Sequence, residues 1–265
     1  MNQKIKISLE NFKVSGYPDE FETKALLSSF GIPVPRGIRI LPGEKPDSEK
    51  LVFPVVVKVC SAHILHKTDQ NGVIIGVEPD KIEETLQEFE KRFPDTPILV
   101  EEQIHFRGPE LIVGAMVDPD FGPAVMVGAG GILTELYKDV SFRLAPLTVR
   151  EAGRMIRELI VSPAFFGYRG LKCDPEWLAQ IITSTAELAV GFGKHFSQLD
   201  INPLVFSKNR WVALDAKLLL NQENKNPVHN PVKKRRSLKS GVRKTKFSPN
   251  PNTHKSSIAP KSPIP

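Results

Sequence analysis

Asp200-Ile201-Asn202-Pro203-Leu204 is followed, after a short polar turn at 207–210, by Ala213-Leu214-Asp215-Ala216-Lys217. Apolar residues flank both stretches, so we predict one strand at 198–206 and a second at 211–217. Strands that follow one another directly do not belong to a simple series of alternating strands and helices. Together with the helices predicted elsewhere, this pair indicates an α+β, or mixed α/β, fold.

The remainder of residues 1–221 contains helices and strands in mixed order. The spacing of apolar residues predicts helices at 19–30, 80–93, 148–161 and 174–192. Asp174 and Pro175 suit the cap and the first turn of the last helix. The apolar positions of the first helix are Phe21, Ala25, Leu26 and Leu27. Further strands are predicted at 38–41, 55–59, 72–77, 98–104, 110–117 and 123–127.

Length and composition predict a sizeable core, because 40% of the 265 residues are hydrophobic. The apolar runs are far shorter than the roughly 20 residues that cross a bilayer, and the stretch 1–12 lacks the apolar segment of a signal peptide. The two cysteines, Cys60 and Cys173, are too few for a disulfide framework and lack ligands at metal-binding spacing. We therefore expect two buried thiols in a cytoplasmic protein without a membrane span.

Charge divides the chain into a body and a tail. Residues 222–265 hold eight Lys, three Arg and one Glu, a charge of +10, so the body carries −4 of the total of +6. Seven of the 23 prolines lie in this tail, where spaced apolar residues are scarce, so we predict a disordered basic tail rich in proline and serine. Its run Lys233-Lys234-Arg235-Arg236 is either a solvated segment, a localisation signal or a weak contact for a polyanion such as nucleic acid.

Three oxygen-bearing side chains in the closing strand pair predict a cation site. Alternation along a strand puts Asp200 and Asn202 on one face, and a hairpin brings Asp215 beside Asn202. Carboxylate and amide oxygens suit Mg²⁺, with phosphate oxygens and water completing its octahedron. Turn chemistry is the alternative explanation, although charge within apolar strands is costly without a partner.

Three further side chains are candidates for contact with a nucleotide. Lys58 stands in the apolar strand 55–59, where an ammonium group must reach solvent or meet an anion such as a phosphate. Glu102 and Glu110 adjoin apolar strands, and their carboxylates are able to accept hydrogen bonds from a ribose or an adenine amino group. Spacing alone favours the interpretation that Glu102 and Glu110 are ordinary surface residues.

Two loops add candidate groups for phosphate chemistry. The loop 60–72 contains His63, His66 and Lys67, and a histidine beside a lysine can accept phosphate or act as a general base, although a lone loop histidine is more often a surface residue. Gly128-Ala129-Gly130-Gly131 follows an apolar strand, and glycine lets backbone N–H groups approach an oxyanion. This run is neither G-x-G-x-x-G nor a Walker A loop, so a tight turn is the alternative.

Several motifs occur along the chain in a specific order, and the main ones are Phe30-Gly31-Ile32-Pro33-Val34-Pro35, Ile64-Leu65-His66-Lys67-Thr68-Asp69, Glu110-Leu111-Ile112-Val113-Gly114, Lys138-Asp139-Val140-Ser141-Phe142-Arg143 and Gly167-Tyr168-Arg169-Gly170. In this order they resemble the ATP-grasp subunit of the ADP-forming, or NDP-forming, acyl-CoA synthetases, a group related to the beta subunit of succinyl-CoA synthetase. The resemblance covers about 22–217. It implies an ATP-grasp fold at 1–221, in which two lobes clasp a nucleotide, the smaller lobe at approximately 25–103.

The resemblance also implies a role for each candidate residue. Lys58 would hold the nucleotide phosphates, and Glu101, Glu102 and Glu110 would lie near adenine and ribose, with Glu101 competing with Glu102 for one place. The implied Mg²⁺ ligands are Asn202, Asp215 and, nearby, Asp200. His66 matches the histidine that carries phosphate towards ADP, and the residues that shape or neutralise the phosphate path are Gly130, Gly131 and Arg143. Asn71 departs from the family, which usually has a glycine before Gly72, and the resemblance implies that this change stiffens the histidine loop.

The implied reaction is acyl-CoA + ADP + phosphate ⇌ carboxylic acid + CoA + ATP, with Mg²⁺ as cofactor and a phosphohistidine as carrier. In the family, the CoA-binding region lies on a separate alpha subunit or on a fused half, so the resemblance implies a partner in an α2β2 assembly. Two alternatives stay open. One is an ATP-grasp ligase that activates a carboxylate without His66, and the other is a catalytically silent regulatory or nucleic-acid-binding protein.

Overall fold

A computed structural model of the chain describes residues 3–15, 17–62, 64, 67, 70–131, 138–171 and 173–221. All described helices and strands belong to one compact unit, Met1–Glu223. The predicted basic tail, 222–265, lies outside the described residues. Among the described helices, none combines the length and the apolar character that crossing a membrane requires.

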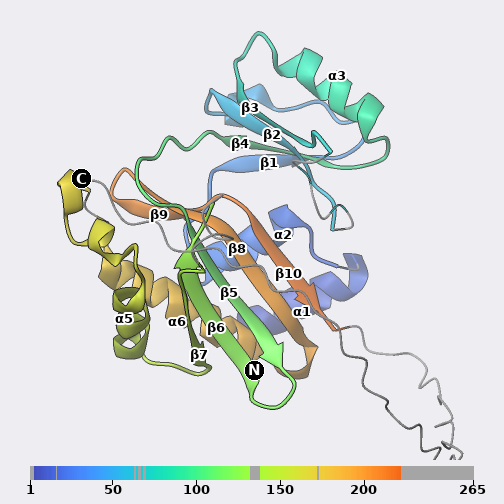
Figure 1. Cartoon of the computed structure of the whole chain (residues 1–265). Helices are drawn as coiled ribbons and strands as arrows, with labels where there is room; N and C mark the ends of the chain where they lie inside the picture. Colours follow the sequence, from blue (N-terminus) through green and yellow to red (C-terminus); the bar gives the residue numbers. More distant parts are fainter. Residues whose placement is uncertain are drawn as a thin grey trace, which may run out of the picture. The chain divides into compact units, whose positions relative to one another are not determined.

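The first sheet contains four antiparallel strands in the order β1-β4-β2-β3 (Figure 1). Their bounds are Gly37–Ile40 for β1, Val55–Val59 for β2, Val73–Val77 for β3 and Ile98–Glu102 for β4. Helix α3, Ile82–Arg92, packs against this sheet through Leu86 and Phe89, as its spacing predicts. The sheet and α3 therefore have a small core of their own.

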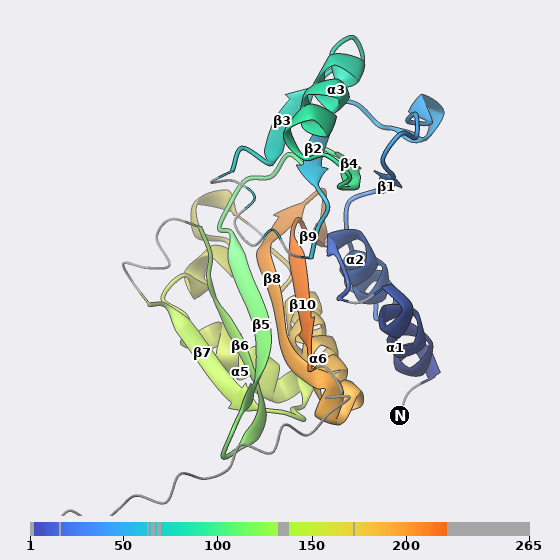
Figure 2. The same ribbon diagram turned by 90° about the vertical axis from the view of Figure 1, so that its right-hand side faces the viewer.

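The second sheet is larger, with the order β10-β8-β5-β6-β7 and with β9 paired to β8. The bounds are Leu111–Asp118 for β5, Gly122–Ala129 for β6, Val140–Leu144 for β7, Phe196–Ser207 for β8, Arg210–Ala213 for β9 and Ala216–Leu220 for β10. Helices α5, Val149–Glu158, and α6, Pro175–Phe192, lie together on one side of it (Figure 2). Short 3-10 turns occupy Ser48–Lys50, Ser162–Phe165, Tyr168–Gly170 and Gly193–His195.

Local signals explain how these elements begin. Thr148 caps α5 and forms a capping box with Glu151, and the side chain of Asp174 caps α6, which starts at Pro175 as expected. The fully buried Trp211 packs edge-on against Phe206, and its indole N–H donates to the carbonyl of Asp174, 2.7 Å away. The cap of α6 is thereby attached to the core of the second sheet.

Two elements correct the sequence-based expectations. Helix α1, Gln3–Ser15, was not predicted, and it buries Ile5, Leu9 and Phe12 in the same core as α6. Strand β7 was not predicted either, and its burial runs against its polarity, because at this edge of the sheet Ser141 is buried whereas Phe142 and Leu144 are exposed. The remaining predicted elements, apart from the last strand, agree with the structure to within a few residues.

The last predicted strand, 211–217, is divided into β9 and β10. Strand β9 pairs with the end of β8, and β10 pairs with its beginning. Between them, the N–H of Leu214 donates to the carbonyl of Pro203, and the N–H of Asn202 donates to the carbonyl of Asp215. This irregular crossing places Asp215 beside Asn202, which is the juxtaposition that the hairpin predicted.

Helix α2, Glu20–Ser29, begins with Asp19 as its cap, but its buried face differs from the predicted one. Leu26 and Leu27 are buried as expected, whereas Ala25 is exposed and Phe21 is half-buried. Glu20 and Lys24 are buried in their place, with 4% and 3% of their surface exposed. The expected apolar face is therefore wrong in part, because this helix turns charged side chains towards charged partners.

Candidate functional site

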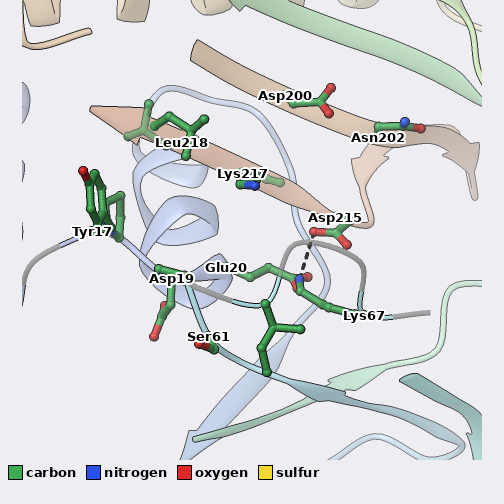
Figure 3. A pocket seen from close by; sticks show the side chains of 15 residues that line it. Tyr17, Asp19, Glu20, Ser61, Lys67, Asp200, Asn202, Asp215, Lys217 and Leu218 are labelled. Carbon is green, nitrogen blue, oxygen red and sulfur yellow. Dashed lines mark hydrogen bonds and ion pairs between the residues drawn. The ribbon is translucent and has the colours of Figure 1, made fainter. Parts of the chain in front are cut away.

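A cavity of about 470 Å³ lies where segments from both ends of the chain meet (Figure 3). Its lining residues are Tyr17, Pro18, Asp19, Glu20, Ser61, Ala62, Ile64, Lys67, Asp200, Asn202 and 215–219. Four parts of the chain line the cavity. They are the start of α2, the residues after β2, strand β8, and strand β10 with the residue before it. The cavity therefore brings together several residues that the sequence singled out separately.

The three predicted cation ligands, Asp200, Asn202 and Asp215, all line this cavity. Burial raises the pKa of both aspartates, and the pKa of Asp200 is raised further by the negative charge of Asp215. Clustered carboxylates with raised pKa values are favourable for a cation, and the oxygen-only donor set suits Mg²⁺. Within the described ranges, no group of three or more His, Cys, Asp or Glu side chains could by itself hold a metal ion. The remaining ligands of a Mg²⁺ ion would therefore come from Asn202, water or a bound phosphate.

Next to the cavity lies a buried cluster of charged side chains. Lys58 on β2 places Nζ 2.8 Å from Glu20 and 2.9 Å from Glu101. Lys24 on α2 contacts the same two carboxylates, with Nζ 2.7 Å from each of them. The anion that the buried Lys58 required is thus supplied by two carboxylates of the protein itself.

The charge cluster also joins the first sheet to the second. The ammonium groups of Lys24 and Lys58 both donate to the carbonyl of Leu214, at 2.7 Å and 2.6 Å. Burial raises the pKa of Glu20, but the surrounding lysines outweigh burial and hold that pKa well below its usual range. Burial lowers the pKa of Lys58, but the carboxylates of Glu20 and Glu101 outweigh it and raise the pKa well above its usual range. Glu20 and Lys58 are therefore both charged at neutral pH.

Lys67 connects the charge cluster to the cavity. Its ammonium group bonds to Glu20 and lies 3.4 Å from Oδ1 of Asp215. Burial lowers the pKa of Lys67, but Glu20 and Asp215 outweigh it and raise the pKa. Figure 3 shows Lys67 reaching from its loop towards Asp215 across the cavity wall.

The predicted adenine and ribose contacts lie in different surroundings. Glu101 is buried among the lysines, whereas Glu102, the next residue on β4, faces the other way. The carboxylate of Glu102 accepts a hydrogen bond from the backbone N–H of Arg36 at 3.1 Å and lies 3.3 Å from the Arg36 guanidinium. Glu110 precedes β5, and its carbonyl accepts from the N–H of Gly130 at 2.6 Å.

Of the predicted phosphate-path residues, Gly130 and Gly131 lie beside Glu110. A Cβ at Gly131, where φ is +72°, would lie 3.3 Å from the Glu110 carboxylate, so that position favours glycine twice over. Arg143 on β7 lies elsewhere on the sheet, opposite Val125, and pairs with Glu158 on α5. His66 and His63 lie outside the described residues.

Two groups of the charge cluster were missed by sequence reasoning. Glu20 and Lys24 look like a surface pair four residues apart on a helix, which is the commonest setting for such a pair. Lys67 was noticed only as a neighbour of His66. Among the cysteines, Cys60 is buried as expected and burial raises the pKa of its thiol to about 12, but Cys173 is only half-buried.

Comparison with known proteins identifies the family. A model of the ATP-grasp domain matches residues 13–220. The beta subunit of ADP-forming acetate–CoA ligase I from Pyrococcus furiosus is 37% identical over 229 residues, which are 82% of this chain and 98% of the relative. An ADP-forming acetate–CoA ligase I from Archaeoglobus fulgidus is 36% identical over 208 residues, 75% of this chain but 30% of that protein.

A solved structure resembles the fold described above. The dinucleotide-forming acetyl-CoA synthetase 1 of Candidatus Korarchaeum cryptofilum, in complex with coenzyme A and Mg-AMPPCP, has a TM-score of 0.69 and 30% identity, and the match covers 82% of this chain and all of that one. In that structure the phosphohistidine segment points towards the nucleotide-binding site. The chain therefore has an ATP-grasp fold and belongs to the ATP-grasp subunits of the ADP-forming acyl-CoA ligases.

Proposed function

We propose that this chain is the nucleotide-binding subunit of an ADP-forming acyl-CoA synthetase, which catalyses acyl-CoA + ADP + phosphate ⇌ carboxylic acid + CoA + ATP. One observation carries the proposal. Asn202 and Asp215 of the second sheet line the cavity, and Lys58 and Glu101 of the first sheet belong to the charge cluster beside it. Phosphoryl transfer depends mainly on neutralising charge and aligning the reacting groups, and this arrangement offers groups of both signs.

Lys58 is the proposed ligand of the nucleotide phosphates. Its ammonium group is already buried and charged, so a phosphate would replace one carboxylate partner with another anion rather than bury a new charge. Glu101, Glu102 and Glu110 are the proposed contacts for adenine and ribose. Glu102 supports this role best, since its carboxylate lies at the junction of the sheets, near Arg36 and Arg210.

Asn202, Asp215 and Asp200 are the proposed residues that hold Mg²⁺. When bound, the ion would neutralise phosphate charge and hold the phosphate oxygens in a fixed geometry. The side chains of this chain would supply the oxygen atoms that hold the ion. Asp200 and Asp215 supply negative charge at the cavity, and Asn202 supplies a neutral oxygen between them.

His66 is the proposed phosphate carrier between the nucleotide and the acyl-CoA. Gly130, Gly131 and Arg143 are proposed to shape or neutralise the path of the phosphate. The guanidinium group of Arg143 is paired with Glu158, so a phosphate would have to displace that carboxylate. A covalent carrier divides a long transfer between two sites into two short ones.

The proposed partner is a CoA-binding alpha subunit, in an α2β2 assembly in the cytoplasm. The chain matches 98% of a relative that is named as a beta subunit but 30% of a relative that is named as the whole ligase. The name of the first relative, a beta subunit, supports a partner subunit. The two free thiols suit a reducing compartment.

The experiment is an assay of acyl-CoA-dependent ATP formation with the co-purified partner, combined with detection of phosphate on the chain. We expect His66→Ala to abolish both the label and ATP formation, and the control His105→Ala, an exposed histidine, to retain both. ATP formation that survives in His66→Ala would replace the carrier mechanism with that of another ATP-grasp ligase. A wild-type complex without nucleotide binding or turnover would instead indicate a silent regulatory protein.

A further inference from the structure

The ammonium group of Lys67 lies between two carboxylates of the cavity wall. It bonds to Glu20 at the start of α2 and lies 3.4 Å from Asp215, just before β10. Only 13% of the Lys67 side chain is exposed, against 63% for a surface lysine such as Lys81. Lys67 is therefore a fixed internal charge, although it stands in a loop.

The backbone of Lys67 is fixed as well. The N–H of Gly72 donates to the carbonyl of Lys67, 2.6 Å away. A Cβ on Gly72 would lie 2.7 Å from Cγ1 of Val59 and 3.0 Å from the same carbonyl, so a larger residue would disturb this contact. The backbone and the ammonium group of Lys67 are therefore both held beside the cavity.

Lys67 and a divalent cation require the same carboxylate. Mg²⁺ binds carboxylate oxygens at about 2.1 Å, so an ion on Asp215 would approach the ammonium group closely. Two positive charges at that separation repel each other in a partly buried site. An ion at Asp215 and an ammonium group at Asp215 therefore compete.

We propose that the ammonium group of Lys67 takes the place of the divalent cation at Asp215, and that cation binding displaces this ammonium group from the Asp215 carboxylate. This inference rests on the proposed function, since it takes Asp215 as a cation ligand. Glu20 keeps Lys67 close to the cavity after displacement, because the bond to Glu20 does not involve the cation. The coupling is reciprocal, so removal of the Lys67 charge must strengthen cation binding.

The first test measures the dissociation constant of Mn²⁺ alone by electron paramagnetic resonance, in the whole chain. We expect Lys67→Met to bind Mn²⁺ about tenfold more tightly than the wild type. Lys67→Arg, which keeps the charge, and Lys81→Met, which removes an exposed charge, should stay close to the wild type. Unchanged or weaker Mn²⁺ binding in Lys67→Met overturns the proposal.

The second test uses the wild-type chain, so it does not depend on how a variant folds. Trace acetylation with acetic anhydride, followed by mass spectrometry, reports how reactive each lysine is. We expect Mg²⁺ to raise the labelling of Lys67 several-fold and to leave that of Lys81 unchanged. Equal labelling of Lys67 with and without Mg²⁺ contradicts displacement.

A third measurement separates this inference from the proposed function. If Asn202→Ala leaves Mn²⁺ affinity unchanged, the cation site lies elsewhere, and both the proposed site and the role of Lys67 fail. If Asn202→Ala weakens Mn²⁺ binding but Lys67→Met does not strengthen it, the site stands and the role of Lys67 alone is wrong. Weaker binding of metal-free ADP in Lys67→Met, with Mn²⁺ affinity unchanged, makes Lys67 a phosphate ligand instead and also overturns the proposal.

Discussion

Lys58 and Glu101 come from neighbouring antiparallel strands of the first sheet, and Nζ of Lys58 lies 2.9 Å from Oε2 of Glu101. In the β2–β4 register, Val56 is opposite Glu101 and Lys58 is opposite Leu99, so both charged side chains project from the same face. Each of them has further partners on α2. The lysine proposed to bind phosphate is therefore held in place before any nucleotide arrives.

Glu20→Gln is expected to lower the free energy of unfolding by about 3–5 kcal/mol, because it leaves buried ammonium groups without their shared carboxylate. Only 2% of the Glu20 side chain is exposed, and it contacts Lys24, Lys58 and Lys67. Urea denaturation of both proteins measures the difference. The control Glu83→Gln, at an exposed position of α3, should change stability by about 0.5 kcal/mol or less. A loss below 1 kcal/mol for Glu20→Gln would show that water reaches the cluster.

The same carboxylate predicts how stability depends on pH. The pKa of Glu20 is depressed below its ordinary value of 4.5, so the folded protein binds its proton less readily than the unfolded chain. The stabilisation is complete above pH 4.5 and is lost as pH falls further, towards the pKa in the folded state. We expect the stability difference between wild type and Glu20→Gln to be constant near neutrality and to shrink below pH 4.5. A constant difference down to acid unfolding would contradict this assignment.

Asp215→Asn is expected to weaken Mn²⁺ binding on the order of tenfold or more, because it removes a full negative charge from the proposed ligand set. Titration followed by electron paramagnetic resonance measures this change. Asp95→Asn serves as the control, since Asp95 is exposed and its positive φ of 58° is tolerated by asparagine. Equal Mn²⁺ affinity in Asp215→Asn and the control would remove Asp215 from the site.

Deletion of residues 222–265 is expected to change the affinity for ADP less than about twofold, because the described site draws on residues 17–219. Calorimetric titration of the full and shortened chains measures this. The shortened chain should lose whatever weak, salt-sensitive binding to DNA the full chain has. A collapse of Mg-ATP binding would give the basic tail a central role in the site.

Much of the fold could be predicted because its signals are local. The strand 55–59 is apolar except for Lys58, and α6 follows a clear cap at Asp174. Helix α1 could also have been predicted, since Ile5, Leu9 and Phe12 recur with helical spacing.

The charge cluster could not be predicted in the same way. Patterns of hydrophobicity assume that buried positions are apolar, and on α2 this assumption fails at Glu20 and Lys24. Besides Glu20, the partners that stabilise Lys24 stand 77 and 190 positions away along the chain, at Glu101 and Leu214. A short stretch of sequence around Lys24 therefore gives no sign that a distant carboxylate neutralises its charge. The convergence of Asp200, Asn202 and Asp215 was predictable, since one strand pair carries all three.

The carbonyl oxygen of Leu214, in the interruption between β9 and β10, has unusual hydrogen-bond partners. In a continuous strand the carbonyl of Leu214 would face the ladder, whereas here it accepts from a lysine of α2 and a lysine of β2. If Lys58 turns towards a phosphate, the carbonyl of Leu214 loses one of these two lysine partners. Ligand occupancy would then alter the tethering of β10, the last strand before residues 222–265.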